Sequence, residues 1–192
     1  TSLLLKKHNV PTPKPYFTFS SEAALENLEK IGYPAVIKPV VGSWGRGVMP
    51  LKDRDTADAI IEVRELNDGP LDRIYYLQEM VNRPPRDIRV IVVGDQVVAA
   101  MYRTSSGSFK TNIALGAEPV VCEITKELED VCMRAAKAVG GGILGVDVME
   151  DKKRGLVVHE VNNTVEFKGL AKVAKKDIPK EMIDFAIKSA IK

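Results

Sequence analysis

Three oxygen-bearing side chains near the end of the sequence have the types and spacing of a magnesium site. The segment LGVDVMEDKKRGLVVHEVNN, residues 144–163, carries Asp147, Glu160 and Asn162. It is typical of two strands joined by a polar turn. If DKKR is the turn, Asp147 lies opposite Val158. Because side chains alternate along a strand, the three polar residues then share one face. Two carboxylates and an amide oxygen suit a hard cation that also binds phosphate, such as Mg²⁺.

The other face of this hairpin is expected to be apolar. We place on it Val146, Val148, Val157 and Val161, together with His159, which we interpret as a packed or surface histidine. The competing interpretation of the acids is a solvent-facing sheet surface, where carboxylates need no metal. We favour the metal because adjacent like charges on a largely apolar hairpin need compensation.

A second candidate lies earlier, where AVIKPV is followed by the glycine-rich stretch GSWGRGV. Lys38 ends an apolar strand, and an ammonium ion there needs a negative partner. A loop with Gly42, Gly45 and Gly47 lets backbone N–H groups approach a phosphate closely, and Ser43 adds a hydroxyl donor. The spacing is neither that of a P-loop nor that of a dinucleotide fingerprint. The alternative is a flexible hairpin from which Lys38 extends into water.

Two further segments could complete a nucleotide site. The stretch QEMV ends a strand, so backbone groups there could bind an adenine edge while Met80 and Val81 form apolar walls. Asp87, in RDIRV, could accept hydrogen bonds from ribose hydroxyl groups. Each signal is weak by itself, because a Gln78–Glu79 pair at a strand end is usually only solvated.

The elements that must position these residues can be predicted from periodicity. Helices are expected in 1–10, 20–32, 55–66, 125–140 and 178–191, with Asp55 as the N-cap of the third. Strands are expected in 33–40 and 73–81. Two hairpins are expected, one turning at Gly94–Asp95 and one at residues 151–154. We therefore predict an α+β chain with a helical remnant and linker in 1–15, a small α/β lobe in 16–81 and an antiparallel-sheet lobe in 82–192.

Composition excludes several classes of protein. The chain has 192 residues, of which 45% are hydrophobic and 28% charged, as in ordinary globular proteins. A net charge of +2 argues against non-specific nucleic-acid binding. We find no apolar run long enough to span a membrane and no signal peptide, so we expect a cytoplasmic protein without a membrane partner. Cys122 and Cys132 have no metal-ligand spacing and are expected to be reduced core thiols.

Taken together and in order, VIKP, GSWGRGV, QEMV, DIRVIVVGD, FKTN and the D…E-V-N set resemble the ATP-grasp ligases of the RimK-like branch. The ending EVNNTVEFKG is similar to a narrower group, LysX, ArgX and their relatives. These ligate 2-aminoadipate or glutamate to the C-terminal glutamate of a small acidic carrier protein, LysW, in lysine and arginine biosynthesis. The resemblance covers essentially the whole chain, and it implies a two-lobed ATP-grasp fold.

The resemblance also implies roles for individual residues. Lys38 and the loop of Gly42, Ser43, Gly45 and Gly47 would contact the phosphates of ATP, Gln78, Glu79, Met80 and Val81 would line the adenine, and Asp87 would meet the ribose. Arg103, Lys110 and Asn112 would act on the transferring phosphoryl group, and Asp147, Glu160 and Asn162 would hold Mg²⁺. Asn163, Thr164, Glu166, Phe167 and Gly169 fall in the stretch associated with amino-acid choice.

The implied partners are ATP, Mg²⁺, an amino acid and an acidic LysW-like carrier. Alternatives are a ligase that adds glutamate to another protein or a small molecule, and a non-catalytic nucleotide-binding fragment. The family normally has an α/β domain before the ATP-grasp lobes, so we expect this chain to be part of a longer, homo-oligomeric enzyme. We also expect the lysines at 168, 172, 175 and 176 to be a candidate docking surface for the carrier.

Overall fold

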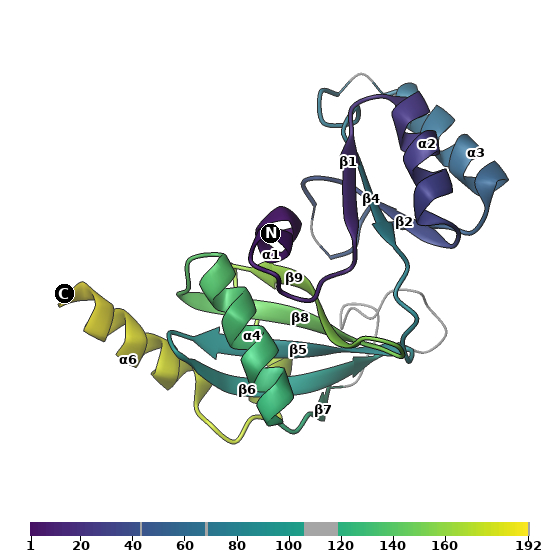
Figure 1. Ribbon diagram of the computed structural model, residues 1–192. Coiled ribbons are helices and arrows are strands. Elements are labelled where there is room, and N and C mark those ends of the chain that lie inside the picture. The colour runs from purple at the N-terminus through teal and green to yellow at the C-terminus, as the bar shows by residue number, and fades with distance from the viewer. Residues whose placement is uncertain (43, 68, 106–118, 192) are drawn as a thin grey trace. The chain divides into compact units, whose positions relative to one another are not determined.

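The computed structural model describes residues 1–42, 44–67, 69–105 and 119–191 (Figure 1). The chain divides into two compact units. One is Pro13–Val81, and the other combines Thr1–Thr12 with Asn82–Lys192. The residues of the predicted helix at the N-terminus thus pack with the larger unit, although residues 13–81 separate them from it in the sequence.

The smaller unit is a four-stranded antiparallel sheet with two helices on one face (Figure 1). The sheet order is β1-β4-β2-β3, and every pairing is antiparallel. The strands are β1 (Pro15–Thr18), β2 (Ala35–Lys38), β3 (Met49–Leu51) and β4 (Tyr75–Glu79), and the helices are α2 (Ser21–Ile31) and α3 (Arg54–Glu65). The short strands β1 and β3 were not predicted, because each is followed or preceded by proline- and glycine-rich sequence.

The core of the smaller unit lies between the helices and the sheet. Leu28 of α2 and Ile61 of α3 pack with Ile37 and Leu77 from the central strands. Ser20 caps α2, and its Oγ accepts from the backbone N–H of Ala23 at 3.2 Å.

The predicted N-cap of α3 was wrong. The cap is Asp53, whose Oδ1 accepts from the backbone N–H of Thr56 at 2.8 Å. Asp53 has an extended backbone three residues before that N–H group, which is the geometry of a capping side chain. Asp55 lies inside the first turn instead, where its negative charge is favourable beside the helix N-terminus.

The larger unit is built on a five-stranded antiparallel sheet with the order β7-β6-β5-β8-β9. Its strands are β5 (Arg86–Val93), β6 (Gln96–Thr104), β7 (Pro119–Val121), β8 (Ile143–Asp151) and β9 (Gly155–Asn162). Its helices are α1 (Ser2–Lys7), α4 (Lys126–Ala138), α5 (Lys168–Ala171) and α6 (Ile178–Ala190). Both predicted hairpins are present, and the predicted α+β class is confirmed.

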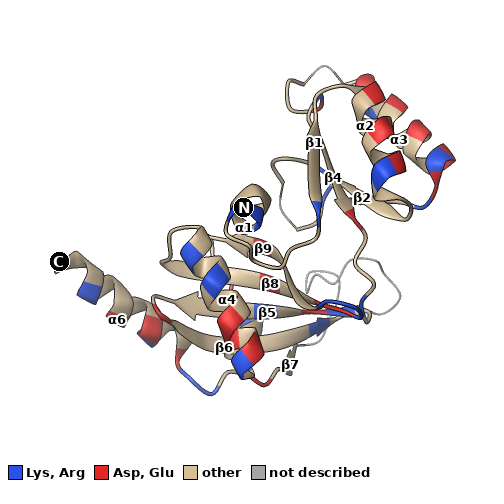
Figure 2. Ribbon diagram, in the orientation of Figure 1, with Lys and Arg blue, Asp and Glu red and all other residues tan. Residues whose placement is uncertain are grey.

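The two faces of this sheet differ in character. One face packs against α4 and α1 through Val90, Val146, Val158 and Leu128. The other face is apolar around Ile91, where Leu170 of α5 and Ile178 of α6 cover it. The same face also carries charged residues of β5, β6 and β8, and Figure 2 shows acidic and basic residues on these neighbouring strands. This second face carries the candidate site.

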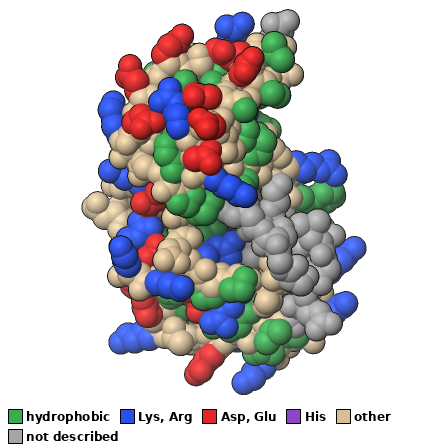
Figure 3. All heavy atoms as spheres, turned by 90° about the vertical axis from the view of Figure 1, so that its right-hand side faces the viewer, with side chains coloured by type: hydrophobic (Ala, Val, Ile, Leu, Met, Phe, Trp, Pro, Cys, Tyr) green, Lys and Arg blue, Asp and Glu red, His purple; other side chains and the backbone are tan. Residues whose placement is uncertain are grey.

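Among the described residues, no helix is both long and apolar enough to cross a bilayer. Cys122 and Cys132 are both buried, and neither forms a disulfide. Acidic and basic side chains are interspersed over the face shown in Figure 3, in agreement with the small net charge.

Candidate active site

The pair of β8 and β9 brings the predicted magnesium ligands onto one face, but in a different register from the one predicted. Asp147 lies opposite Glu160, and Gly145 lies opposite Asn162. Directly opposed residues point to the same side of a sheet, and Asn162 lies two residues beyond Glu160. All three side chains therefore share a face.

The predicted pairing of Asp147 with Val158 was wrong for two reasons. The turn begins one residue later than expected, with Asp151 opposite Gly155, and the pairing shifts again between Asp147 and Val148. That bulge places His159 as an extra residue in β9. Val158 therefore lies in the α4-facing core, whereas Val157 lies opposite Met149 on the polar face, contrary to its predicted place.

Asp151 sets the position of the turn. Its Oδ1 accepts from the backbone N–H groups of Lys153 and Arg154 at 2.9 and 3.0 Å, and the Arg154 guanidinium donates to Oδ2 at 2.9 Å. Burial alone would raise the pKa of Asp151, but these hydrogen bonds lower it below its usual value. An ionised side chain thus closes the hairpin that carries the candidate metal ligands.

The carboxylate of Asp147 is held by two arginines. Arg89 donates through Nη1 to Oδ1 at 2.8 Å, and Nη2 of Arg103 lies 3.1 Å from the same oxygen. Burial alone would raise the pKa of Asp147, but Arg103 and Arg89 lower it below its usual value, so the group is ionised at neutral pH. Since both contacts end on Oδ1, we expect Oδ2 to be the oxygen offered to a metal.

Arg89 is a site residue that the sequence analysis missed. It lies opposite Asp147 in the pairing of β5 with β8, and only 7% of it is exposed. Gly145 gives it room, because a Cβ atom at that position would lie 2.9 Å from the Arg89 Cζ atom. The available signal was an arginine inside the apolar run IRVIVV, where a buried charge requires a partner.

Arg103 and Asp87 form a two-point ion pair next to these residues. Arg103 donates through Nε to Oδ1 of Asp87 at 2.6 Å and through Nη2 to Oδ2 at 2.9 Å. Burial alone would lower the pKa of the Arg103 guanidinium, but Asp147 and Asp87 raise it. Asp87, Arg103, Asp147 and Arg89 therefore form a continuous chain of alternating charges across three strands. A ribose contact of Asp87 stays a prediction.

The donor set fits a hard divalent cation. Asp147 is ionised, Glu160 is exposed, and Asn162 is half-buried on the same face. The part of the chain that the structure describes has no group of three His, Cys, Asp or Glu residues suited to a metal. Two acids with one amide are compatible with that finding, since Mg²⁺ takes part of its coordination from water and phosphate.

In the smaller unit, Lys38 ends β2 beside an aromatic pair. Its Nζ atom lies 5.7 Å from the centre of the Tyr76 ring, and Tyr76 stacks on Phe17 with ring centres 4.5 Å apart. These residues lie on neighbouring strands, because Lys38 pairs with Tyr76 and Phe17 pairs with Tyr76. The half-buried ammonium group is thereby directed along the face of the sheet that carries neither helix.

The glycine-rich loop that follows has the backbone that only glycine adopts easily. Gly45 and Gly47 have φ values of 67° and 70°, and a Cβ atom at Gly42 would lie 3.0 Å from the ring of Pro39. Trp44, which precedes Gly45, also has a positive φ of 56°. The Cζ atom of Arg46 lies 5.2 Å from the centre of the Trp44 ring. Ser43 lies outside the described residues.

A model of the RimK-like ATP-grasp domain matches residues 1–186. The chain belongs to the RimK-like ATP-grasp family. An RimK domain ATP-grasp protein from Sphaerobacter thermophilus has the same fold, with a TM-score of 0.78 and 26% identity, over 96% of this chain and 64% of that one.

Three curated relatives of this ATP-grasp chain have assigned names. It is 40% identical to the α-aminoadipate–LysW ligase LysX of Saccharolobus solfataricus, over 97% of the chain and 68% of that protein. The glutamate–LysW ligase ArgX of Sulfolobus acidocaldarius is 34% identical, over 94% and 64%. The tetrahydromethanopterin:α-L-glutamate ligase of Methanococcus maripaludis is 38% identical, over 99% and 64%. The chain thus spans about two thirds of the length of these relatives.

Two residues of the segment predicted to line the adenine in this ATP-grasp domain make hydrogen bonds within the smaller unit. Gln78 is buried, and its Nε2 donates to the carbonyl oxygen of Pro13 at 3.2 Å. Oε1 of Glu79 accepts from the backbone N–H of Lys14 at 2.9 Å. Both contacts tie β4 to the residues before β1. Met80 and Val81 are half-buried, and their contact with adenine stays a prediction.

The segment predicted to select the amino acid begins where β9 ends. Asn163, Thr164 and Glu166 are exposed, whereas Phe167 packs against the core beneath α5 and α6, and Gly169 lies within α5. The exposed polar residues are therefore available to a ligand, and Phe167 has a packing role. Lys110 and Asn112 lie outside the described residues.

Proposed function

We infer that this chain contributes the nucleotide-binding and ligating part of an ATP-dependent carboxylate–amine ligase. In the proposed reaction, the α-amino group of 2-aminoadipate or glutamate is joined to the γ-carboxylate of the C-terminal glutamate of a LysW-type carrier. The observation that carries this proposal is the polar face of the larger unit, where Arg89, Arg103, Asp147, Glu160 and Asn162 lie on neighbouring strands. The LysX and ArgX relatives support the choice of substrates.

Different residues of this chain would bind the phosphates, the metal and the adenine of the nucleotide. Lys38 and the backbone N–H groups of the glycine-rich loop suit the phosphates, since they offer a cation and unobstructed donors. Asp147, Glu160 and Asn162 would hold Mg²⁺, which supplies charge neutralisation of the phosphate oxygens. Met80 and Val81 offer half-buried apolar surface for the adenine.

The proposed chemistry proceeds through an acyl phosphate. A carboxylate oxygen of the carrier attacks the γ-phosphorus of ATP, and ADP leaves. The amino group then attacks the activated carbonyl carbon, loses a proton, and displaces phosphate. Such steps depend on positioning and on stabilising negative charge rather than on a protein nucleophile. Arg103 suits that task, because its guanidinium stays protonated between Asp87 and Asp147.

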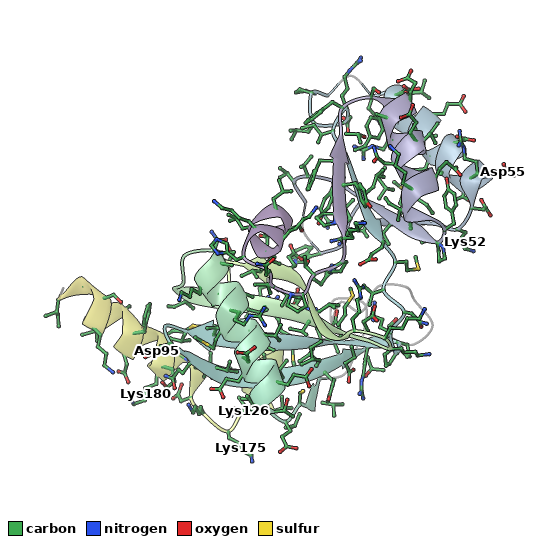
Figure 4. All side chains as sticks on the ribbon, viewed as in Figure 1. Lys52, Asp55, Asp95, Lys126, Lys175 and Lys180 are labelled. Atoms are coloured by element: carbon green, nitrogen blue, oxygen red, sulfur yellow. The ribbon has the colours of Figure 1, made fainter. Side chains whose placement is uncertain are left out.

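The carrier surface is proposed on charge. Lys168, Lys172, Lys175 and Lys176 are exposed on and after α5. Figure 4 shows Lys175 and Lys180 extending outward from this region. Opposite charge accelerates the encounter with an acidic partner. We expect Lys172→Glu with Lys175→Glu to raise the KM for the carrier and leave ATP affinity unchanged, whereas Lys6→Glu with Lys7→Glu on α1 serves as the control. An unchanged carrier KM in the α5 double variant would refute this surface.

The decisive experiment measures ADP release by the full protein. We expect release to require both a LysW-type carrier and an amino acid, and we expect Glu160→Gln to abolish it. Glu150→Gln is the matched control, because Glu150 lies on β8 and its Oε2 accepts from Nε of Arg86 at 2.6 Å. Full activity of Glu160→Gln would refute the metal assignment. ADP release without a carrier would refute the proposed acceptor.

A second candidate is a ligase that adds glutamate to a small molecule. The 38% identity to the tetrahydromethanopterin:α-L-glutamate ligase favours it specifically. Assays with 2-aminoadipate and glutamate side by side, each with and without carrier, separate the candidates. The two amino acids differ by one methylene, which is worth about 1–3 kcal/mol of discrimination in a pocket.

A cytoplasmic location is consistent with the unbridged thiols of Cys122 and Cys132.

A further inference from the structure

We propose that Tyr76 is a positioning residue for Lys38. Its ring, supported by the ring of Phe17, holds the lysine ammonium group in place for the phosphates of a nucleotide. The inference rests on the proposed function, because it takes the phosphate contact of Lys38 from there. It goes beyond that function by giving a role to two aromatic residues to which the sequence analysis assigned none.

The three side chains form one row across the sheet of the smaller unit. Tyr76 lies on β4 between the other two, because it pairs with Phe17 of β1 and with Lys38 of β2. The next row contains Leu77 and Ile37, which pack into the core beneath α2 and α3. Since successive side chains of a strand point to opposite faces, the row of Tyr76 lies on the face without helices (Figure 1).

The aromatic pair has a geometry that restrains the lysine. The ring planes of Phe17 and Tyr76 lie 15° apart with their centres separated by 4.5 Å, so each ring limits the rotation of the other. The Nζ atom of Lys38 lies 5.7 Å from the centre of the Tyr76 ring. A cation within about 6 Å of a ring is attracted by the negative charge of the ring face. All three residues are half-buried, which strengthens this attraction relative to a contact in water.

A ring suits this task better than a carboxylate would. A lysine side chain has four flexible carbon–carbon bonds, and ordering it on binding a ligand lowers the affinity. The ring restricts the ammonium group before the ligand arrives. Because the ring carries no net charge, its contact with Lys38 leaves the positive charge of the ammonium group uncancelled for a phosphate. Tyr76 therefore favours the bound position of Lys38 without competing with an anionic ligand.

The inference predicts an effect that depends on the phosphates of the ligand. Calorimetric titration of the full protein measures the affinities for ATP with Mg²⁺ and for adenosine. For Tyr76→Leu we expect the affinity for ATP to fall by about 3- to 10-fold. We expect the affinity for adenosine to change by less than about twofold, since adenosine has no phosphate. Tyr76→Phe keeps the ring and should bind ATP within about threefold of wild type.

Tyr16→Leu is the matched control. The Nζ atom of Lys14 lies 5.5 Å from the centre of the Tyr16 ring, so this pair makes the same kind of contact in the same unit. Tyr16, however, packs against the core on the helix-covered face. Its replacement removes an aromatic ring of the sheet but not the one beside Lys38. We expect this variant to bind both ligands within about twofold of wild type.

A double-mutant cycle with Lys38→Met identifies the group through which Tyr76 acts. In that background we expect Tyr76→Leu to weaken ATP binding by less than about twofold. Additive losses would overturn the inference. An equal loss of ATP and adenosine affinity in Tyr76→Leu would also overturn it, because Tyr76 would then support the fold or the adenine. So would a loss in Tyr76→Phe as large as in Tyr76→Leu, because the hydroxyl group would then matter rather than the ring.

These measurements need no acceptor, so they separate the inference from the proposed reaction. Failure to transfer an amino acid to a LysW-type carrier would refute the reaction and leave the binding results valid. Wild-type ATP affinity in Lys38→Met would refute the phosphate contact of Lys38 and this inference with it. If Tyr76→Leu does not fold, Phe17→Leu replaces it, because it removes the support of the Tyr76 ring. We then expect a two- to threefold loss for ATP alone, at about the lower limit of the range above, and an unchanged ATP affinity would contradict the inference.

Discussion

Arg89→Met is the most direct test of the charge chain in the larger unit. The substitution removes one of two guanidinium groups that contact the buried carboxylate of Asp147. Breaking a buried ion pair costs about 3–5 kcal/mol when the surviving charge has no other partner. Because Arg103 still contacts Asp147 at 3.1 Å, we expect a smaller loss of unfolding free energy, about 2–3 kcal/mol.

The matched control is Arg86→Met. Arg86 lies on the same strand and also pairs with an acid of β8, but the side chains of Arg86 and Glu150 are 39% and 26% exposed. Arg86 also lies 4.1 Å from the centre of the Tyr102 ring. A partly exposed pair with a cation–π contact contributes about 1 kcal/mol. Urea unfolding followed by circular dichroism measures both variants. A loss in Arg89→Met no larger than that in Arg86→Met would refute the reasoning.

The pH dependence provides a second readout of the same contact. The pKa of Asp147 is below its usual value of 3.8, so its ionised form stabilises the folded protein above that pH. This contribution is lost as the pH falls through the lowered pKa. Without Arg89, the pKa of Asp147 moves back upward and less stability is lost on acidification. We therefore expect the difference in unfolding free energy between wild type and Arg89→Met to shrink below about pH 4.

Three other substitutions test separate parts of the structure. Gly145→Ala should destabilise the protein by about 1–3 kcal/mol by crowding Arg89, and far less in an Arg89→Met background, as measured by urea unfolding. Glu160→Gln should leave the melting temperature nearly unchanged, because Glu160 is exposed, while weakening Mn²⁺ binding measured by electron paramagnetic resonance. Asp53→Ala should cost about 1 kcal/mol and Asp55→Ala clearly less; equal losses would contradict the assignment of the cap.

The sequence analysis placed Asp147, Glu160 and Asn162 on one face, as the structure does, but through two errors in register that cancelled. A turn at residues 152–154 without a bulge would have placed Asp147 opposite His159, and Glu160 would then have pointed into the α4-facing core. The bulge at His159 restores Glu160 to the face of Asp147. Strand periodicity tells which face of the sheet a side chain points to only while the pairing is uninterrupted. The position of a bulge depends on how both strands pack, and no local pattern in residues 144–163 specifies it.

The sequence pattern could not predict which charged residues contact each other, and the reason is a different one. Arg89 and Asp147 are 58 positions apart, and their contact exists because β5 lies between β6 and β8 in the sheet. Periodicity predicted both hairpins, because each joins neighbouring segments. It could not predict which hairpin strands would pair with each other. Asp87 was accordingly interpreted alone, and its contact with Arg103 of the next strand was missed.

The order of charges explains how such a face could bind a metal and a phosphate together. Asp87, Arg103, Asp147 and Arg89 include two charges of each sign, so the chain that they form is neutral. Glu160 adds a further carboxylate on the same face. A divalent cation bound by Asp147 and Glu160 would leave this face positively charged, and an anionic phosphate would then be attracted to it. Without the cation, Glu160 would repel the phosphate. On the proposed metal site, this charge pattern would make metal and nucleotide binding mutually dependent, as expected for a metal nucleotide that enters as one unit.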